Sequence, residues 1–418
     1  MPLGEEVALD TLQAADQLVH QSAHLGEVAG DGKHLGAEAV LHCVSNARGQ
    51  GGLELCCRGG ERLNLVACAL ECGVDLRGLD SAADGFCDAC LRAGDCFGVH
   101  CGRRYRDDRM DVSELDYELP RELIAQHPAA RRDESRLLVY ERSTGSVRHR
   151  RFSELPEELA GELVVVNDTK VVPARIPIES PRGEVLLLER IEGDVWEGLA
   201  RPTRKLKPGH RYGAVELIEH LGEGRWRLRL DGEPAGATPL PPYITAPLDD
   251  PARYQTVYAR DPGSAAAPTA GLHFTPELLE RLDVERVTLH VGLDTFRPVA
   301  EERLEEHPIH GERYEVEPRA WERIRSAERV LAVGTTTVRT LETLAHGGPI
   351  TGRTELFITP GFEFRRVDAL LTNFHLPRST LLALVMAFAG AEETRALYRL
   401  AVEERYRFYS FGDAMLIL

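Results

Sequence analysis

The segment Val330-Leu-Ala-Val-Gly-Thr-Thr-Thr-Val-Arg339 places an apolar run directly before a glycine and three hydroxyl residues. We predict a strand over Val330 to Val333, because the run is short, apolar and flanked by polar residues. A helix should follow over Val338 to Leu344 and end at Gly347-Gly348. The segment therefore predicts a strand, a polar loop and a helix in immediate succession.

A second segment, Leu370-Leu-Thr-Asn-Phe-His-Leu-Pro-Arg-Ser-Thr380, has the same order. Here we predict a strand over Val367 to Leu371 and a mostly apolar helix, capped by Ser379-Thr380 and closed at Gly390. Junctions of this kind present backbone N–H groups and hydroxyls at the mouth of a sheet, where ligands usually bind. On their residues alone, the two junctions indicate a pocket for a nucleoside or an anion.

Similar patterns extend the core around these junctions. Further strands are predicted at Leu137 to Tyr140, Val147 to Phe152, Leu163 to Val166, and Val287 to His290. A polar loop, Asn167-Asp168-Thr169-Lys170, should follow the third of them. Helices are predicted to begin at Thr275-Pro276-Glu277 and to cover Trp321 to Glu328. The alternation predicts an α/β core, in which helices pack on a mixed sheet.

Residues 176–238 are expected to form an all-β structure of their own. Short strands are predicted at Val185 to Arg190, Val195 to Ala200, Ala214 to Ile218, and Arg225 to Leu230. In the last strand the apolar and arginine residues alternate, so Arg225, Arg227 and Arg229 share one face. That face is either a solvated surface or a contact for an RNA backbone. Nearby basic residues add to its charge: Arg201, Arg204, Lys205, Lys207 and Arg211.

The predicted architecture is an α/β core domain, formed by 110–175 and 239–418, with a small all-β, barrel-like domain inserted at 176–238. Residues 1–109 differ, because they hold all nine cysteines and contain no isoleucine or tryptophan. One interpretation is a zinc module built on Cys87, Cys90, Cys96 and Cys101. A disulfide-rich domain is a second. We expect instead that 1–109 has no stable fold and that the natural protein starts at Met110.

The composition limits the function classes. A net charge of −17 argues against a protein that coats nucleic acid nonspecifically, although a local basic patch could still grip one RNA. The longest apolar run, Leu381 to Ala389, is too short to cross a bilayer, which needs roughly 20 residues. The first residues lack the basic and apolar pattern of a signal peptide. We therefore expect a cytoplasmic protein.

Two loops place histidines beside glycines that allow close approach of a ligand. They are Ala266-Ala-Pro-Thr-Ala-Gly-Leu-His-Phe274 and Thr288-Leu-His-Val-Gly-Leu-Asp-Thr-Phe296. A single histidine is more often structural than catalytic. Because His273, His290 and His375 all stand beside loops at element ends, we take the three together as candidates for acid–base chemistry.

Seven ordered motifs carry a resemblance to a known family. They are Asn167-Asp-Thr-Lys-Val-Val-Pro-Ala-Arg175, Leu240-Pro-Pro-Tyr-Ile244, Tyr254-Gln-Thr-Val-Tyr258, Ala267-Pro-Thr-Ala-Gly-Leu-His-Phe274, Gly334-Thr-Thr-Thr-Val-Arg339, Thr372-Asn-Phe-His-Leu-Pro377 and Tyr406-Arg-Phe-Tyr-Ser-Phe-Gly-Asp-Ala-Met415. Over about 110–418 the chain resembles the S-adenosylmethionine:tRNA ribosyltransferase-isomerases. It departs from them at Asp294, where the family often has glycine, and in His307-Pro-Ile-His-Gly-Glu312, where the family has His-x-Met-His-Ser-Glu.

The resemblance implies a reaction in queuosine synthesis. The ribosyl part of S-adenosylmethionine moves to 7-aminomethyl-7-deazaguanine at the tRNA wobble position and isomerises. Epoxyqueuosine forms, and adenine and methionine leave. S-adenosylmethionine is then a co-substrate, no metal or redox cofactor is required, and a monomer can suffice. The alternatives are another S-adenosylmethionine-dependent RNA transferase, such as a methyltransferase, and a noncatalytic RNA-binding protein.

Site residues follow from the motifs as expectations. His273, His290 and His375 are candidate acids or bases, with Glu312 as a reserve base. Residues expected to bind substrate are Asn167, Lys170, Arg175, Thr269, Gly271, Gly334, Thr335, Thr336, Arg339 and Asn373. Among them, Thr335, Thr336, Arg339 and Asn373 would hold the nucleoside or the methionine carboxylate. Asn167, Lys170 and Arg175 would bind the modified base or tRNA phosphate.

Overall fold

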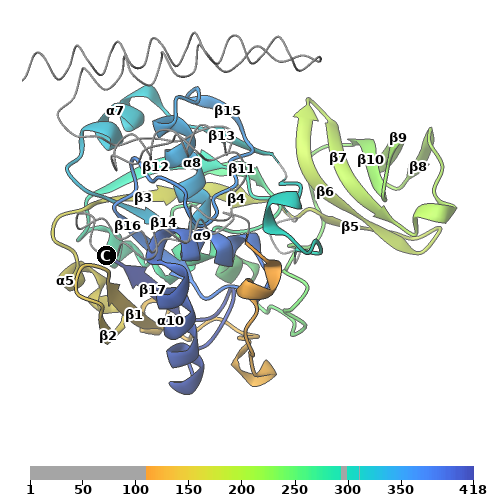
Figure 1. The fold of residues 1–418 in the computed structure, drawn as a ribbon. Helices are drawn as coiled ribbons and strands as arrows, with labels where there is room; N and C mark the ends of the chain where they lie inside the picture. Colours follow the sequence, from red (N-terminus) through yellow and green to blue (C-terminus); the bar gives the residue numbers. More distant parts are fainter. Residues whose placement is uncertain (1–109, 293–298, 310) are drawn as a thin grey trace, which may run out of the picture. The chain divides into compact units, whose positions relative to one another are not determined.

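The computed structural model describes residues 110–292, 299–309 and 311–418 (Figure 1). The predictions for 1–109 lie outside these residues, including the metal site at Cys87, Cys90, Cys96 and Cys101. Asp294 also lies outside them. Within the described part of the chain, none of the helices is long and apolar enough to cross a membrane.

A nine-stranded mixed sheet forms the centre of the fold (Figure 1). In spatial order its strands are β15 (Thr351–Thr354), β13 (Glu312–Glu315), β12 (Val284–Leu289), β3 (Leu163–Asn167), β14 (Val330–Val333), β16 (Ala369–Asn373), β17 (Ala414–Ile417), β1 (Arg136–Glu141) and β2 (Ser146–Arg151). The four central strands from β12 to β16 are parallel, whereas both ends of the sheet contain antiparallel pairs. The prediction of a mixed sheet with helices is therefore confirmed.

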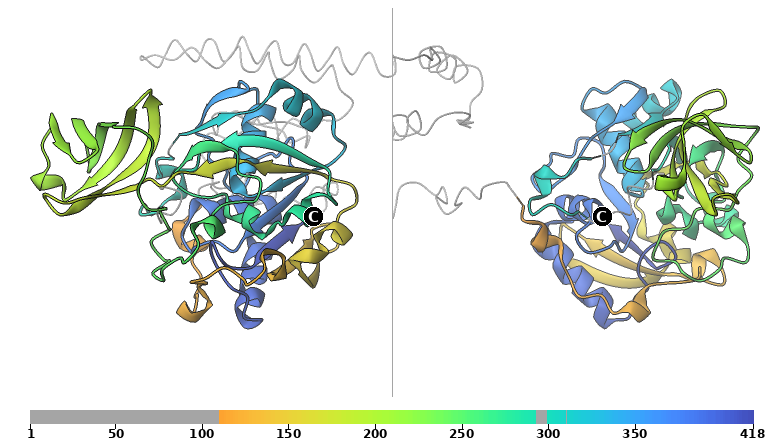
Figure 2. Two further views of the ribbon diagram at one scale, coloured as in Figure 1. Left: turned by 180° about the vertical axis from the view of Figure 1, so that it is seen from behind. Right: turned by 90° about the vertical axis from the view of Figure 1, so that its right-hand side faces the viewer.

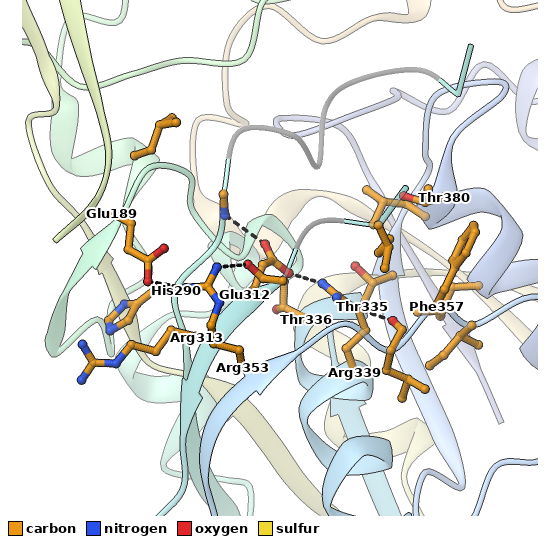
Figure 3. A pocket seen from close by; sticks show the side chains of 18 of the residues that line it. Glu189, His290, Glu312, Arg313, Thr335, Thr336, Arg339, Arg353, Phe357 and Thr380 are labelled. Atoms are coloured by element: carbon orange, nitrogen blue, oxygen red, sulfur yellow. Dashed lines mark hydrogen bonds and ion pairs between the residues drawn. The ribbon is translucent and has the colours of Figure 1, made fainter. Parts of the chain in front are cut away.

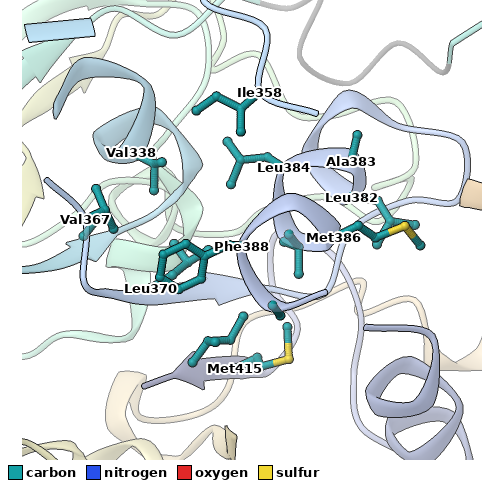
Figure 4. Close-up of a cluster of buried hydrophobic side chains, with 14 of the residues drawn as sticks. Val338, Ile358, Val367, Leu370, Leu382, Ala383, Leu384, Met386, Phe388 and Met415 are labelled. Atoms are coloured by element: carbon teal, nitrogen blue, oxygen red, sulfur yellow. The ribbon is translucent and has the colours of Figure 1, made fainter. Parts of the chain in front are cut away.

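Helices cover both faces of this sheet. The helices on one face are α7 (Pro318–Ser326), α8 (Thr335–Ala345), α9 (Thr380–Ala389) and α10 (Ala391–Glu403), and those on the other are α5 (Leu155–Glu158) and α6 (Pro276–Leu279). Each face of the sheet has its own hydrophobic core, and side chains of strand β14 alternate between the two. Val330 and Ala332 pack in the first core, under α7 to α10, and Leu331 and Val333 pack in the second, under α5 and α6. Figure 4 shows part of the first core, around α9. All four β14 side chains are buried, as the apolar run predicts.

A second, antiparallel sheet of six strands is curled on itself (Figures 1 and 2). Its order is β5 (Arg175–Ile178), β6 (Gly183–Glu192), β7 (Val195–Arg201), β10 (Arg225–Leu230), β9 (Val215–Gly222) and β8 (His210–Tyr212). The inner side of the curl holds its own core, which includes Trp196, Trp226 and Leu228. The alternation predicted for Arg225 to Leu230 is thus present.

The arginine face of β10 is paired with acids on neighbouring strands. Arg225 lies 2.7 Å from Glu197, and Arg227 lies 2.6 Å from Glu219. Arg229 contacts two further carboxylates, Asp194 and Glu216. Because these charges are already neutralised, the geometry favours a solvated ladder of ion pairs over a phosphate-binding surface.

Several element boundaries differ from the predicted ones. Helix α8 begins at Thr335 rather than Val338, and the Thr337 hydroxyl donates back to the carbonyl of Val333, the last residue of β14, at 2.7 Å. Helix α7 begins at Pro318, because proline suits a first helical turn. The loop expected at Asn167 to Lys170 instead contains strand β4 (Thr169–Val171), which pairs with β11 (Asp261–Ser264).

Candidate active site

A pocket opens where the core sheet meets strands β6, β7 and β10 of the curled sheet (Figure 3). Its walls come from the first turns of α8 and α9, from β13 and β15, and from the loop after β12. We call it the first pocket, and it is lined by Glu189, Glu197, Arg225, His290, Gly292, His307, Ile309, Glu312, Arg313, Thr335, Thr336, Arg339, Arg353, Phe357, Thr380 and Leu381, among others. Distant segments thus converge on one cavity.

A second pocket adjoins the first through Thr335, Thr336 and Leu381, which line both. It also contains Thr269, Gly334, Asn373 and His375 from the two predicted strand–loop–helix junctions and the loop before α6. The structure therefore brings together nine of the expected site residues: His290, Glu312, Thr335, Thr336 and Arg339 in the first pocket, and Thr269, Gly334, Asn373 and His375 in the second.

The remaining expected residues lie outside both pockets. Lys170 is exposed on β4, and Arg175, on β5, lies 3.7 Å from Glu184. Gly271 is buried beside Tyr258, and a Cβ at this glycine would stand 1.9 Å from the tyrosine hydroxyl. The missing side chain at Gly271 thus allows this close packing.

Asn167 lines neither pocket, but it contacts Thr336, which lines both. It is fully buried at the end of β3, and its side-chain amide donates to the Leu289 carbonyl at 2.9 Å and to the Thr336 hydroxyl at 3.2 Å. Its oxygen accepts the backbone N–H groups of Thr169 and Leu289. Asn167 therefore positions Thr336 and ties β3 to β12.

Glu312 and Arg339 form a buried ion pair in the wall of the first pocket (Figure 3). The second Glu312 oxygen accepts the Gly292 backbone N–H at 2.9 Å. Arg339 also donates from Nε to the Leu356 carbonyl at 3.0 Å and from its other terminal nitrogen to the Thr354 carbonyl at 3.1 Å. Because these groups are already hydrogen-bonded to each other and to the backbone, the geometry supports a bracing role: the two side chains hold the pocket wall together rather than transfer protons or bind an anion.

His273 is buried, and both of its ring nitrogens have partners. Nδ1 lies 2.7 Å from the Ser135 hydroxyl, and Nε2 lies 3.3 Å from the Asn373 amide nitrogen. Burial, with the nearby Arg407 and Arg132 charges, lowers the pKa of His273 to about 3. The ring is therefore neutral near pH 7 and orients Asn373, whose oxygen accepts the Thr269 hydroxyl.

His375 reaches the second pocket from the loop after β16. Its Nε2 lies 2.7 Å from the Thr372 hydroxyl. Burial lowers the pKa of His375 to about 3. A neutral ring of this kind donates a hydrogen bond from one nitrogen and accepts one at the other, but near pH 7 it lacks the second proton that an imidazolium could give as an acid.

His290 faces the first pocket and is fixed from two sides. Its Nδ1 lies 2.9 Å from the Thr169 hydroxyl. A Cβ at Gly263 would lie 2.8 Å from the ring, so only glycine leaves room for it there. Burial, followed by the charge of Arg313, lowers the pKa of His290.

Several residues of the first pocket were not among the predicted site residues, including Arg353, Arg313 and His307. Arg353 donates to Glu189 at 2.6 Å and to the Gly311 carbonyl at 2.6 Å, which links β15 to β6 (Figure 3). Arg313 lines the pocket, and no hydrogen bond or ion pair joins its guanidinium to another described residue. His307 lies 2.7 Å from Glu301. Only His307 had a signal in the sequence, as the first residue of the run that ends at Glu312.

Comparisons with known proteins match the part of the chain that carries the seven motifs. Residues 112–417 match the family model described as "Queuosine biosynthesis protein". An S-adenosylmethionine:tRNA ribosyltransferase-isomerase from Rubrobacter xylanophilus is 56% identical over 327 residues, covering 74% of this chain and 98% of that protein. The one from Acetivibrio thermocellus is 49% identical over 340 residues, covering 74% and 100%. A crystal structure of S-adenosylmethionine tRNA ribosyltransferase from Thermotoga maritima is 41% identical, covers 73% of this chain and 100% of that one, and has a TM-score of 0.44.

Proposed function

The chain belongs to the queuosine biosynthesis protein family, and from this premise we propose that it is an S-adenosylmethionine:tRNA ribosyltransferase-isomerase. It moves the ribosyl part of S-adenosylmethionine to 7-aminomethyl-7-deazaguanine at the wobble position of tRNA and isomerises it. Epoxyqueuosine is formed, and adenine and methionine are released. No electrons are gained or lost overall, so the reaction needs no redox cofactor, and S-adenosylmethionine serves as co-substrate.

The observation that carries the proposal is the junction of the two pockets. A transfer between two substrates requires their reacting groups to meet within a few ångströms. The first and second pockets meet at Thr335 and Thr336, at the start of the 11-residue helix α8. Hydroxyls and free backbone N–H groups at such a start suit the oxygens of a ribosyl group.

Arg313 is the cation that we assign to the methionine carboxylate. Arg339 was the expected partner, but its guanidinium already binds Glu312 and two carbonyls. Arg313 lines the same pocket and is exposed. A charged hydrogen bond of this kind contributes about 1.5–3 kcal/mol to binding.

Arg313→Ala is therefore expected to raise the KM for S-adenosylmethionine about 10- to 100-fold, with a much smaller change in kcat. Steady-state kinetics with both substrates varied measure this. Arg365→Ala, at an exposed arginine outside both pockets, is the matched control. A higher KM for tRNA alone would instead make Arg313 a phosphate contact.

Gly263→Ala tests the position of His290. The new methyl group would overlap the imidazole ring, at 2.8 Å from Cε1 and 2.9 Å from Nδ1, so we expect the ring to move. Displacement of about 1 Å at a reacting centre can cost about 100-fold in rate. Gly352→Ala, whose nearest contact would be an ordinary 3.4 Å, should keep its activity. Unchanged kcat/KM in the first variant would remove His290 from the site.

Product analysis separates this function from its alternatives. With S-adenosylmethionine and tRNA that carries the aminomethyl base, we expect adenine and methionine in equal amounts and a mass gain on the tRNA. A methyltransferase would release S-adenosylhomocysteine instead. An RNA-binding protein would leave S-adenosylmethionine intact.

A further inference from the structure

His307 and Glu301 form a dyad at the first pocket. His307 Nδ1 lies 2.7 Å from a Glu301 carboxylate oxygen, and the two side chains are 12% and 29% exposed. The ring also packs edge-on against Phe357, with the ring centroids 6.3 Å apart. His307, Phe357 and Ile309 all line the pocket. The dyad therefore stands at the cavity wall, partly shielded from water.

The hydrogen bond to the Glu301 carboxylate determines which nitrogen of the His307 ring carries the proton. The hydrogen bond from His307 lowers the pKa of Glu301, so the carboxylate is ionised near pH 7 and can only accept. The Nδ1 atom must then carry the proton of the neutral ring, and Nε2 keeps its lone pair. A carboxylate in this position also stabilises the imidazolium that forms when Nε2 takes up a proton.

His290 and His375 of the two pockets, and the neighbouring His273, lack this arrangement. His273 has partners at both ring nitrogens, and the pKa of His375 is about 3. The ring of His290 is held by a hydroxyl, and burial and Arg313 disfavour its charged form. Among the described residues that line the two pockets, no histidine other than His307 has a carboxylate bonded to its ring.

Resting on the proposed function, we propose that His307, oriented by Glu301, is the base that removes a proton from C5′ of the S-adenosylmethionine ribose. The C5′–H bond breaks and its electron pair stays on C5′, next to the positive sulfur. The proton forms a new bond to Nε2 of His307. The step gives a neutral ylide and an imidazolium, so atoms and charge balance without a further reactant.

The first test removes the base. His307→Ala and His307→Gln are compared with the wild-type chain, with added imidazole as a small-molecule substitute. We expect kcat to fall about 100- to 10,000-fold, the KM for S-adenosylmethionine to change little, and imidazole to restore part of the rate in His307→Ala. His346→Gln, at a histidine outside both pockets, should behave as wild type.

The second test concerns Glu301 as a positioning residue. We use S-adenosylmethionine that carries two deuterium atoms at C5′. Glu301→Gln should lower kcat and enlarge the isotope effect on kcat, because proton removal becomes rate-limiting. A lower kcat with an unchanged isotope effect would contradict the role of Glu301.

The outcomes separate this inference from the function on which it rests. If the wild-type chain releases adenine and methionine while both His307 variants keep their rate, another group is the base and only this inference fails. A large loss in both variants without imidazole rescue, although urea unfolding curves match those of the wild type, also contradicts it. If the wild-type chain consumes no S-adenosylmethionine, the proposed function fails as well.

Discussion

Arg339→Ala is expected to lower the free energy of unfolding by about 3–5 kcal/mol, because it leaves the Glu312 carboxylate buried without its cation. The side chains of Arg339 and Glu312 are only 11% and 8% exposed. The variant also frees the Thr354 and Leu356 carbonyls, which Arg339 binds in the wall of the first pocket. We therefore expect both stability and activity to fall, as measured by urea unfolding and by turnover.

Two controls make this result specific. Arg281→Ala breaks an exposed ion pair with Glu157, in which the side chains are 50% and 59% exposed, so it should cost at most about 1 kcal/mol. The double variant Arg339→Met with Glu312→Gln removes both charges and should recover part of the lost stability. A loss below about 1 kcal/mol in Arg339→Ala would contradict the bracing role.

Stability is also expected to fall as the pH is lowered from 7 to 5, by about 2 kcal/mol for each of His273 and His375. Burial holds the pKa of both rings at about 3, against about 6.5 in an unfolded chain. Between these values the unfolded chain binds more protons than the folded one. The stabilisation is thus complete above pH 6.5 and is lost as the pH falls toward 3.

Urea unfolding at pH 7, 6 and 5 measures this dependence. His375→Gln and His273→Gln should each remove about half of the slope that the two histidines produce, because each deletes one titrating ring. Acids with a lowered pKa, such as Glu158, lose their contribution mainly below pH 5, so the change in this window comes from the buried histidines, to which His290 adds in the same direction. A wild-type stability that does not change between pH 7 and 5 would show that the two rings are not held neutral.

The parts of the fold that sequence predicts are those with a local cause. The runs at Leu163 to Val166 and Val330 to Val333 are buried strands because each is continuously apolar. The alternation in Arg225 to Leu230 predicts which side chains face the core. It does not predict the acids opposite the arginines, because that depends on register, such as Arg227 opposite Glu197 and Glu219.

The roles of site residues depend on partners far away in the chain. In the sequence, Arg339 is a charged residue near the start of a predicted helix, within one of the motifs. Its neighbours in the sequence do not show whether such an arginine binds a ligand or pairs with another part of the fold. Its partner Glu312 is 27 residues away. His273 is bonded to groups 138 and 100 residues away, and Arg353 to Glu189 at a separation of 164. Such pairings exist only in the folded chain.

The most direct test of the central claim follows two labels of S-adenosylmethionine in the same reaction. The protein is incubated with tRNA carrying 7-aminomethyl-7-deazaguanine and with S-adenosylmethionine labelled either in the ribose or in the methyl group. We predict that the ribose label enters the tRNA while the methyl label leaves with methionine. Methyl label in the tRNA, or no transfer of ribose label, would contradict the account.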